Sequence, residues 1–222
     1  MINFVSLGQS CQTTHQISYF ADHNPQSAAL VKSPFDWLIC PVESTTEWLK
    51  QGLRTFSIDE IVEHRGHAYW PRFNLWFWHG FFDRSADTPV LKIAEFAEPE
   101  LSKHDYLRNK FLALDLSKTH FILSNTQNNL NTEVFEENER SSYWFDEENI
   151  DNLQLTLNHF YSDSVSLQVV TRPDRSSSNL IQRENVHTLP IDQSNWKGDK
   201  LAWGNLLQGL ASGVSRPPLV GK

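Results

Sequence analysis

The sequence predicts an α/β fold in which a parallel sheet lies between two layers of helices, a three-layer sandwich. Four short segments are apolar or β-branched and bounded by polar residues, as buried strands of a parallel sheet are. Segments with helical spacing of apolar residues lie between or beside them, which favours a doubly wound arrangement. A chain of 222 residues is long enough for a single domain, 1–222. The predicted strands are residues 3–7, 119–124, 165–171 and 186–190.

The predicted helices follow from apolar stripes and from capping signals. The turn Gly8-Gln9-Ser10 separates the first strand from the first helix, and the other stripes recur every three or four residues. Two pairs of residues have the spacing of a capping box: Ser44 with Glu47, and Ser57 with Glu60. The first pair predicts a helix that ends near Gly52, and the second predicts a shorter helix. The apolar stripes predict helices over 11–22, 102–114, 150–161 and 203–210.

An aromatic-rich insertion interrupts the regular pattern over residues 28–100. Eight of the 14 residues from 69 to 82 are aromatic, and helical or strand periodicity weakens there. We expect this insertion to cover part of the functional site. Residues 215–222 read as a flexible tail.

Composition excludes several classes of partner. The net charge of -8 argues against nucleic acid or an anionic membrane as the main partner, and no apolar stretch approaches the roughly 20 residues of a membrane helix. The start of the chain lacks the pattern of a signal peptide, and two cysteines make no disulfide framework, so we expect a cytoplasmic protein. The sequence contains no glycine-rich phosphate loop, so we expect no cofactor. His64 and His67 lack further ligands at zinc spacing, so we expect no metal, and the oligomeric state stays open.

Cys11 occupies the position where an α/β enzyme places a nucleophile. In an open parallel sheet, ligands bind beyond the carboxyl ends of the strands. A thiol at a helix N-terminus faces unpaired N–H groups and the positive end of the helix dipole, which favour the reactive thiolate. Backbone N–H groups near Ser10 and Cys11, helped by the Gln9 side chain, could hold an oxyanion. The alternative is a small buried side chain at a strand–helix junction.

His79 and Asp36 are the candidate partners of this thiol. His79 lies among aromatic residues that would desolvate it, and a neutral imidazole can take the thiol proton. Asp36 lies between Phe35 and Trp37, where a carboxylate needs partners, so it could orient an imidazole or hold substrate. Asn125 follows the second predicted strand and could orient the histidine instead. His79 as a core histidine, and Asp36 as a structural carboxylate, are the alternatives.

These motifs resemble a bacterial domain family labelled as papain-like cysteine peptidases. The family pattern is S-L-G-x-x-C, then P-F-D-W, then F-x-H, which residues 6–11, 33–38 and 77–79 resemble. A following helix and strand, here 106–114 and 120–123, extend the resemblance from residue 2 to about residue 125. The resemblance implies that Cys11 is the nucleophile, His79 the base and Asp36 a functional acid. The C-G-S-C-W context of papain-type enzymes is absent, so acyl transfer by cysteine is the implied chemistry, and Trp37 and Trp78 are expected beside the substrate.

Two other functions remain open. Gly8-Gln9-Ser10 resembles the Gly-Asp-Ser turn of SGNH-type esterases and sugar O-acyl enzymes, with His187 three residues after Glu184. In that hypothesis Ser10 is the nucleophile and His187 the base, although Gln9 replaces the usual Asp. The other hypothesis is a non-catalytic module that binds carbohydrate or peptide through its eight tryptophans. The substrate or ligand is accordingly a small molecule, a peptide or a glycan.

Overall fold

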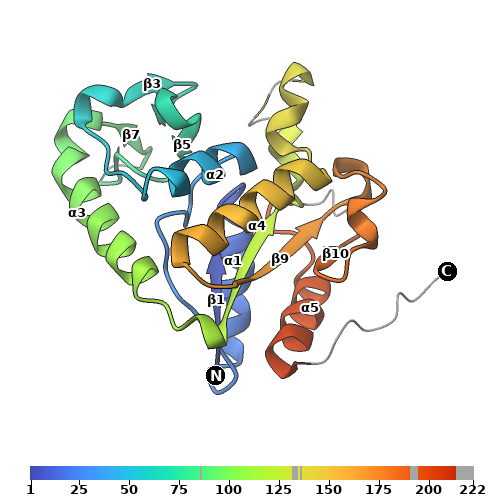
Figure 1. Ribbon diagram of the computed structural model, residues 1–222. Coiled ribbons are helices and arrows are strands. Elements are labelled where there is room, and N and C mark those ends of the chain that lie inside the picture. The colour runs from blue at the N-terminus through green and yellow to red at the C-terminus, as the bar shows by residue number, and fades with distance from the viewer. Residues whose placement is uncertain (86, 132–134, 136, 191–194, 214–222) are drawn as a thin grey trace.

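The computed structural model describes residues 1–222 except 86, 132–134, 136, 191–194 and 214–222, so the expected tail at 215–222 lies outside the described residues. Its centre is a five-stranded sheet in the order β10-β9-β8-β1-β2, and every pair is parallel (Figure 1). The order reverses direction between β1 and β8, which is the switch point of a doubly wound sheet. The strands are β1 (Ile2–Ser6), β2 (Ala28–Leu30), β8 (Thr119–Ser124), β9 (Ser166–Thr171) and β10 (Val186–Thr188).

Alternate side chains of each central strand enter two different cores. Val5, Phe121 and Val169 pack with the helices of one face, whereas Phe4 and Ile122 pack with those of the other. This alternation follows from the two-residue repeat of a strand, and both faces are apolar because helices cover both.

The helices form the two outer layers. Apolar side chains of α1 (Cys11–His23) and α5 (Lys200–Ser212) share one core, while those of α2 (Val42–Lys50) and α4 (Glu147–Tyr161) share the other with α3 (Ile93–Leu112). Figure 1 shows α2 and α4 side by side in front of the sheet, with α1 behind it. The predicted three-layer α/β fold is therefore confirmed. No helix in the described ranges is long and apolar enough to cross a membrane.

The insertion has two small antiparallel sheets and an aromatic interior. β3 (Val62–His64), β4 (His67–Trp70) and β5 (Leu75–Phe77) form one sheet, and β6 (Phe82–Asp83) pairs with β7 (Val90–Leu91). Most aromatic side chains of this region are buried against one another, so they stabilise the fold and are not free to stack on a ligand. The fully or nearly fully buried ones are Phe35, Trp48, Phe56, Trp70, Phe73, Trp76, Phe77 and Phe81.

Short 3₁₀ helices connect these elements. Ser57 and Glu60 form the predicted capping box, but it closes only the single turn η1. Ser44 does not cap a helix: α2 already begins at Val42, and the Ser44 hydroxyl donates to Asn74 O. The turns are η1 (Ile58–Glu60), η2 (Pro71–Phe73), η3 (Leu116–Lys118), η4 (Asn128–Asn131), η5 (Glu137–Tyr143), η6 (Pro173–Arg175) and η7 (Leu180–Gln182).

Two elements of the insertion differ from the prediction. Residues 28–30 form the edge strand β2 rather than the start of an irregular insertion, and Ala28 and Leu30 pair with Ile2 and Phe4. α3 begins at Ile93, nine residues before the predicted start, and it contains Pro99. Pro99 is the seventh residue of the helix, beyond the four N–H groups that lack helical partners, so it removes one hydrogen bond to the carbonyl of Glu95.

Arg175 ties the loops at the carboxyl edge of the sheet together. Its guanidinium is buried and donates to Asn125 O at 2.7 Å, Gln127 O at 2.5 Å and Asn128 O at 2.9 Å. Burial lowers the pKa of Arg175 to about 10. The loops that follow β8 and β9 are thus fixed to one another by charge-assisted hydrogen bonds.

We predict that Arg175→Met lowers the free energy of unfolding by about 3 kcal/mol or more, because three buried carbonyl groups lose a charged donor. Urea denaturation measures the change. Arg183→Met is the matched control: Arg183 pairs with Asp151 on the surface, where an ion pair contributes about 0–1 kcal/mol. Equal losses in the two variants would contradict this account of the carboxyl edge.

Candidate functional site

The loop after β1 holds the start of α1 in a fixed position. Gly8 and Gln9 both have left-handed backbone, with φ of 80° and 65°. A Cβ on Gly8 would lie 3.2 Å from Cys40 Cβ, and Gln9 N donates to Cys40 O at 3.0 Å. The left-handed Gln9 costs energy that glycine would not, and such strained residues cluster at functional sites. Extended Ser10 then places Cys11 at the first residue of α1.

The Cys11 thiol is buried in an apolar cluster. Cys11 is 2% exposed. Burial raises its pKa well above the ordinary value and outweighs the opposite effect of its own backbone N–H. The thiol is therefore neutral at pH 7, in contrast to the thiolate that its helix position alone favours. Its cluster contains Ile39, Trp76, Leu130, Phe135 and Tyr143, with Tyr69, Trp78 and Trp196 packed against it.

Cys40 is the second buried thiol of the chain. It is fully buried, and burial raises its pKa to about 12. Its sulfur accepts the Thr45 hydroxyl at 3.2 Å. Cys40 lies just before the N-terminus of α2 and is buried like Cys11, so it is a reference thiol at a second helix start within the same molecule.

Glutamine side chains of α1 hold a segment of residues 195–198 over the helix. Gln12 Nε2 donates to Trp196 O at 2.7 Å, and Gln16 Nε2 donates to Lys197 O and, at 3.4 Å, to Gly198 O. The Gln12 backbone N–H is satisfied by Gln127 Oε1 at 3.1 Å. The Trp196 ring lies 5.3 Å from the His15 ring, so this segment reaches the same helix face as Cys11.

Asp36 contacts the same helix one turn after Cys11. Its carboxylate accepts the Thr14 hydroxyl at 3.2 Å, the Ser33 backbone N–H at 3.2 Å and the Ser33 hydroxyl at 3.4 Å. Burial raises its pKa to about 6, although these donors and Lys32 act in the other direction. Asp36 therefore fixes the 33–38 turn to α1.

His79 lies at an exposed edge of the insertion. Its ring contacts the edge of Trp37, with centroids 5.3 Å apart, and Trp37 itself has a left-handed φ of 63°. Partial desolvation lowers the pKa of His79, and Arg84, His67 and Lys103 lower it further. Among the described residues, no hydrogen bond or ring contact joins His79 to Cys11 or Asp36. Trp78, in contrast, packs against the Cys11 cluster and stacks on His67 at 3.8 Å.

The Asn125 side chain joins loops at the carboxyl edge of the sheet by hydrogen bonds. Its Nδ2 donates to Tyr143 O at 3.0 Å and to Arg175 O at 2.9 Å, and its Oδ1 accepts the Thr171 hydroxyl at 2.8 Å. The amide thus has three protein partners and orients loops. None of these contacts involves a histidine.

The pair proposed for the esterase hypothesis is separated in the structure. The Ser10 hydroxyl makes a long contact of 3.5 Å to Ser124 O. His187 lies in the edge strand β10, where its Nε2 contacts Gln168 Oε1 at 2.8 Å. β10 and β1 are separated by two strands, so a Ser10–His187 pair is not supported by the sheet order.

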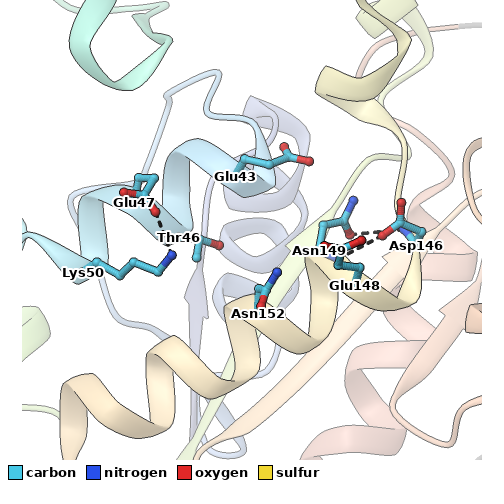
Figure 2. Close-up of a pocket in the computed structure, with 8 residues that line it drawn as sticks. All are labelled: Glu43, Thr46, Glu47, Lys50, Asp146, Glu148, Asn149 and Asn152. Atoms are coloured by element: carbon cyan, nitrogen blue, oxygen red, sulfur yellow. Dashed lines mark hydrogen bonds and ion pairs between the residues drawn. The ribbon is translucent and has the colours of Figure 1, made fainter.

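A polar pocket of about 390 Å³ lies between α2 and α4, and Figure 2 shows its lining residues. Burial raises the pKa of Glu43, and the nearby charge of Asp146 adds to this shift. Lys50 pairs with Glu47 at 2.7 Å, and Asp146 caps α4 through Asn149. Within the described part of the chain, no group of three or more His, Cys, Asp or Glu is arranged to hold a metal. The lining residues are Glu43, Thr46, Glu47, Lys50, Asp146, Glu148, Asn149 and Asn152.

Trp196 packs against the Cys11 cluster and contacts the His15 ring, and the sequence interpretation missed both residues. Residues 11 and 15 are four apart on one helix, which places them on the same face. This spacing was a usable signal. No sequence signal marked Trp196, because it follows the last strand of the sheet and reaches α1 only through tertiary packing.

Comparison of the chain with protein-family models, with curated proteins and with solved structures found no match. The functional argument therefore depends on the residues and geometry of this chain.

We predict that Asp36 makes the protein less stable as pH rises from 4 to 7. Its folded pKa of about 6 exceeds its ordinary value of 3.8, so the folded state binds the extra proton and its contribution is lost above pH 6. Two pKa units correspond to about 3 kcal/mol. The free energy of unfolding of wild type minus that of Asp36→Asn should fall by about this amount over the range, measured by urea denaturation. If the free energies of unfolding of wild type and Asp36→Asn changed equally with pH, the raised pKa of Asp36 would be contradicted.

Proposed function

We propose that this protein is a cysteine-dependent acyl-transfer enzyme, a hydrolase or peptidase-like enzyme, in which Cys11 is the nucleophile. The observation that carries the proposal is the position of Cys11: it is the first residue of α1, directly after β1, at the switch point of the sheet. Doubly wound sheets bind ligands at that point. The strained Gln9 and the packed Gly8 fix this position.

The surrounding residues support the chemistry of acyl transfer. The thiol is neutral, so a base must accept its proton as the sulfur attacks a carbonyl carbon. Backbone N–H groups of Ser10 and Cys11 are the candidate donors to the resulting oxyanion. Gln9 Nε2 already donates to Ser142 O at 2.8 Å, so its role is to position the loop. The base then returns the proton to the leaving group, which leaves an acyl thioester for water or another acceptor.

The same reasoning bounds the substrate and the compartment. A peptide, an ester or an acylated glycan carries the required carbonyl, and the net charge of -8 disfavours nucleic acid. Cys11 and Cys40 are both unpaired thiols, which fits a reducing cytoplasm. His79 remains a candidate base, because Trp37 joins it to the turn that contains Asp36.

The proposal predicts that iodoacetamide modifies Cys11 about tenfold or more faster than Cys40 at pH 7. Both thiols are buried with raised pKa values, so a difference requires a proton acceptor near Cys11. Modified peptides are quantified by mass spectrometry over time. Equal slow rates would sink the nucleophile assignment, and Cys11→Ala verifies the peptide assignment.

A further inference from the structure

We infer that His15, rather than His79, is the base that takes the Cys11 proton, with Trp196 holding its ring in place. The inference rests on the proposed function, since it assigns the proton acceptor of the same thiol.

Helix geometry places the His15 imidazole beside the thiol. Residues four apart on an α-helix have Cβ atoms about 5–6 Å apart, and long helical side chains lean toward the helix N-terminus. His15 therefore leans toward Cys11, which is the first residue of the same helix. A side chain of this length can bring a ring nitrogen to a neighbour one turn earlier without any movement of the backbone.

Trp196 restrains this ring. It contacts His15 with ring centroids 5.3 Å apart, and it packs against the cluster that contains Cys11. Its carbonyl accepts Gln12 Nε2 at 2.7 Å, so α1 itself fixes the tryptophan. Gly198 follows two residues later with a left-handed φ of 77°, and a Cβ there would lie 2.6 Å from Gln12 Nε2, so a larger residue would be strained and would displace the Gln12 amide.

Polar atoms around the thiol lack partners among the described residues. His15 Nε2, Gln9 Oε1 and Thr13 Oγ1 are buried without a hydrogen bond. Gln9 is fully buried and lies two residues before Cys11, whereas Thr13, two residues after Cys11 on α1, projects from a different side of the helix. The Gln9 amide is held beside the cluster, because its Nε2 donates to Ser142 O next to Tyr143. Buried polar groups are normally satisfied, so this concentration indicates a place where a polar ligand completes the contacts.

The charge environment keeps the imidazole neutral and able to accept a proton. Desolvation lowers the pKa of His15 most, and the charges of Lys197 and Lys200 lower it further. Lys197 belongs to the segment over α1 and Lys200 to α5, so these are the charged groups that face His15 from the elements packed against it. No carboxylate contributes to this shift.

In the resulting step, the sulfur forms a bond to the acyl carbon while its proton passes to His15. Collapse of the tetrahedral intermediate breaks the bond from the acyl carbon to the leaving group, which takes that proton from His15. Water then gives a proton to the same imidazole and attacks the thioester carbonyl, and the bond from the acyl carbon to sulfur breaks as His15 returns that proton to the Cys11 sulfur, which releases the acid and restores the thiol. Atoms and charges balance without a cofactor.

The test measures the alkylation rate of Cys11 by iodoacetamide from pH 6 to 9 in wild type, His15→Gln and His79→Gln. Wild type should give a rate that levels off once His15 is deprotonated. His15→Gln should lower the rate at pH 7 by about 10²-fold and make it rise about tenfold per pH unit, as an unassisted thiol does. His79→Gln should follow wild type. An unchanged Cys40 rate in each variant shows that the fold is intact, and His15→Asn serves as a second variant.

Two results would overturn the inference, and they are distinguishable. If His79→Gln steepens the pH profile and His15→Gln does not, His79 is the base and the proposed function stands. If Cys11 in wild type reacts no faster than Cys40, the nucleophile assignment fails and His15 has no thiol to serve.

Discussion

The structure depends on the packing and hydrogen bonds that hold the N-terminus of α1 against the carboxyl edge of the sheet. Left-handed Gln9 and close-packed Gly8 bring the chain from β1 into the helix. Around it, the amides of Gln12 and Gln16 bind residues 196–198, while Gln127 satisfies the Gln12 N–H. Arg175 fixes the neighbouring loops through their carbonyls.

Burial and the helix dipole act on the Cys11 thiol in opposite directions, and burial is the larger effect. A helix N-terminus lowers a thiol pKa, whereas enclosure by apolar side chains raises it. A thiol enclosed by Trp76, Phe135 and Tyr143 stays neutral until a base accepts its proton. Such a site would react with a substrate that completes its contacts and would resist adventitious oxidation. Asp36 and Asn125 have structural roles at this edge. The Asp36 carboxylate accepts a hydrogen bond from α1, and the Asn125 amide donates to two backbone carbonyls.

Local sequence pattern predicted the elements whose signals are local. The four apolar strands and the helix that starts at Cys11 are confirmed, because apolar runs bounded by polar residues and the turn residues before the helix act over short distances. β2 has only three residues and pairs through its backbone, so no pattern marked it. Ser44 has capping-box spacing, yet tertiary packing starts α2 at Val42. For the site, the spacing of Cys11 and His15 was visible, whereas the burial of Cys11 and the arrival of Trp196 depend on contacts between distant segments.

The most direct test of the central claim is to trap an acyl-enzyme. Wild type and Cys11→Ser are mixed with p-nitrophenyl acetate at pH 7, and intact and peptide masses are followed against time. The account predicts one acetyl group per chain on the peptide that contains Cys11, formed with a burst of p-nitrophenol and absent from Cys40. An acetyl group on Ser10 in wild type, or no acylation at the carboxyl edge in either protein, would contradict the account.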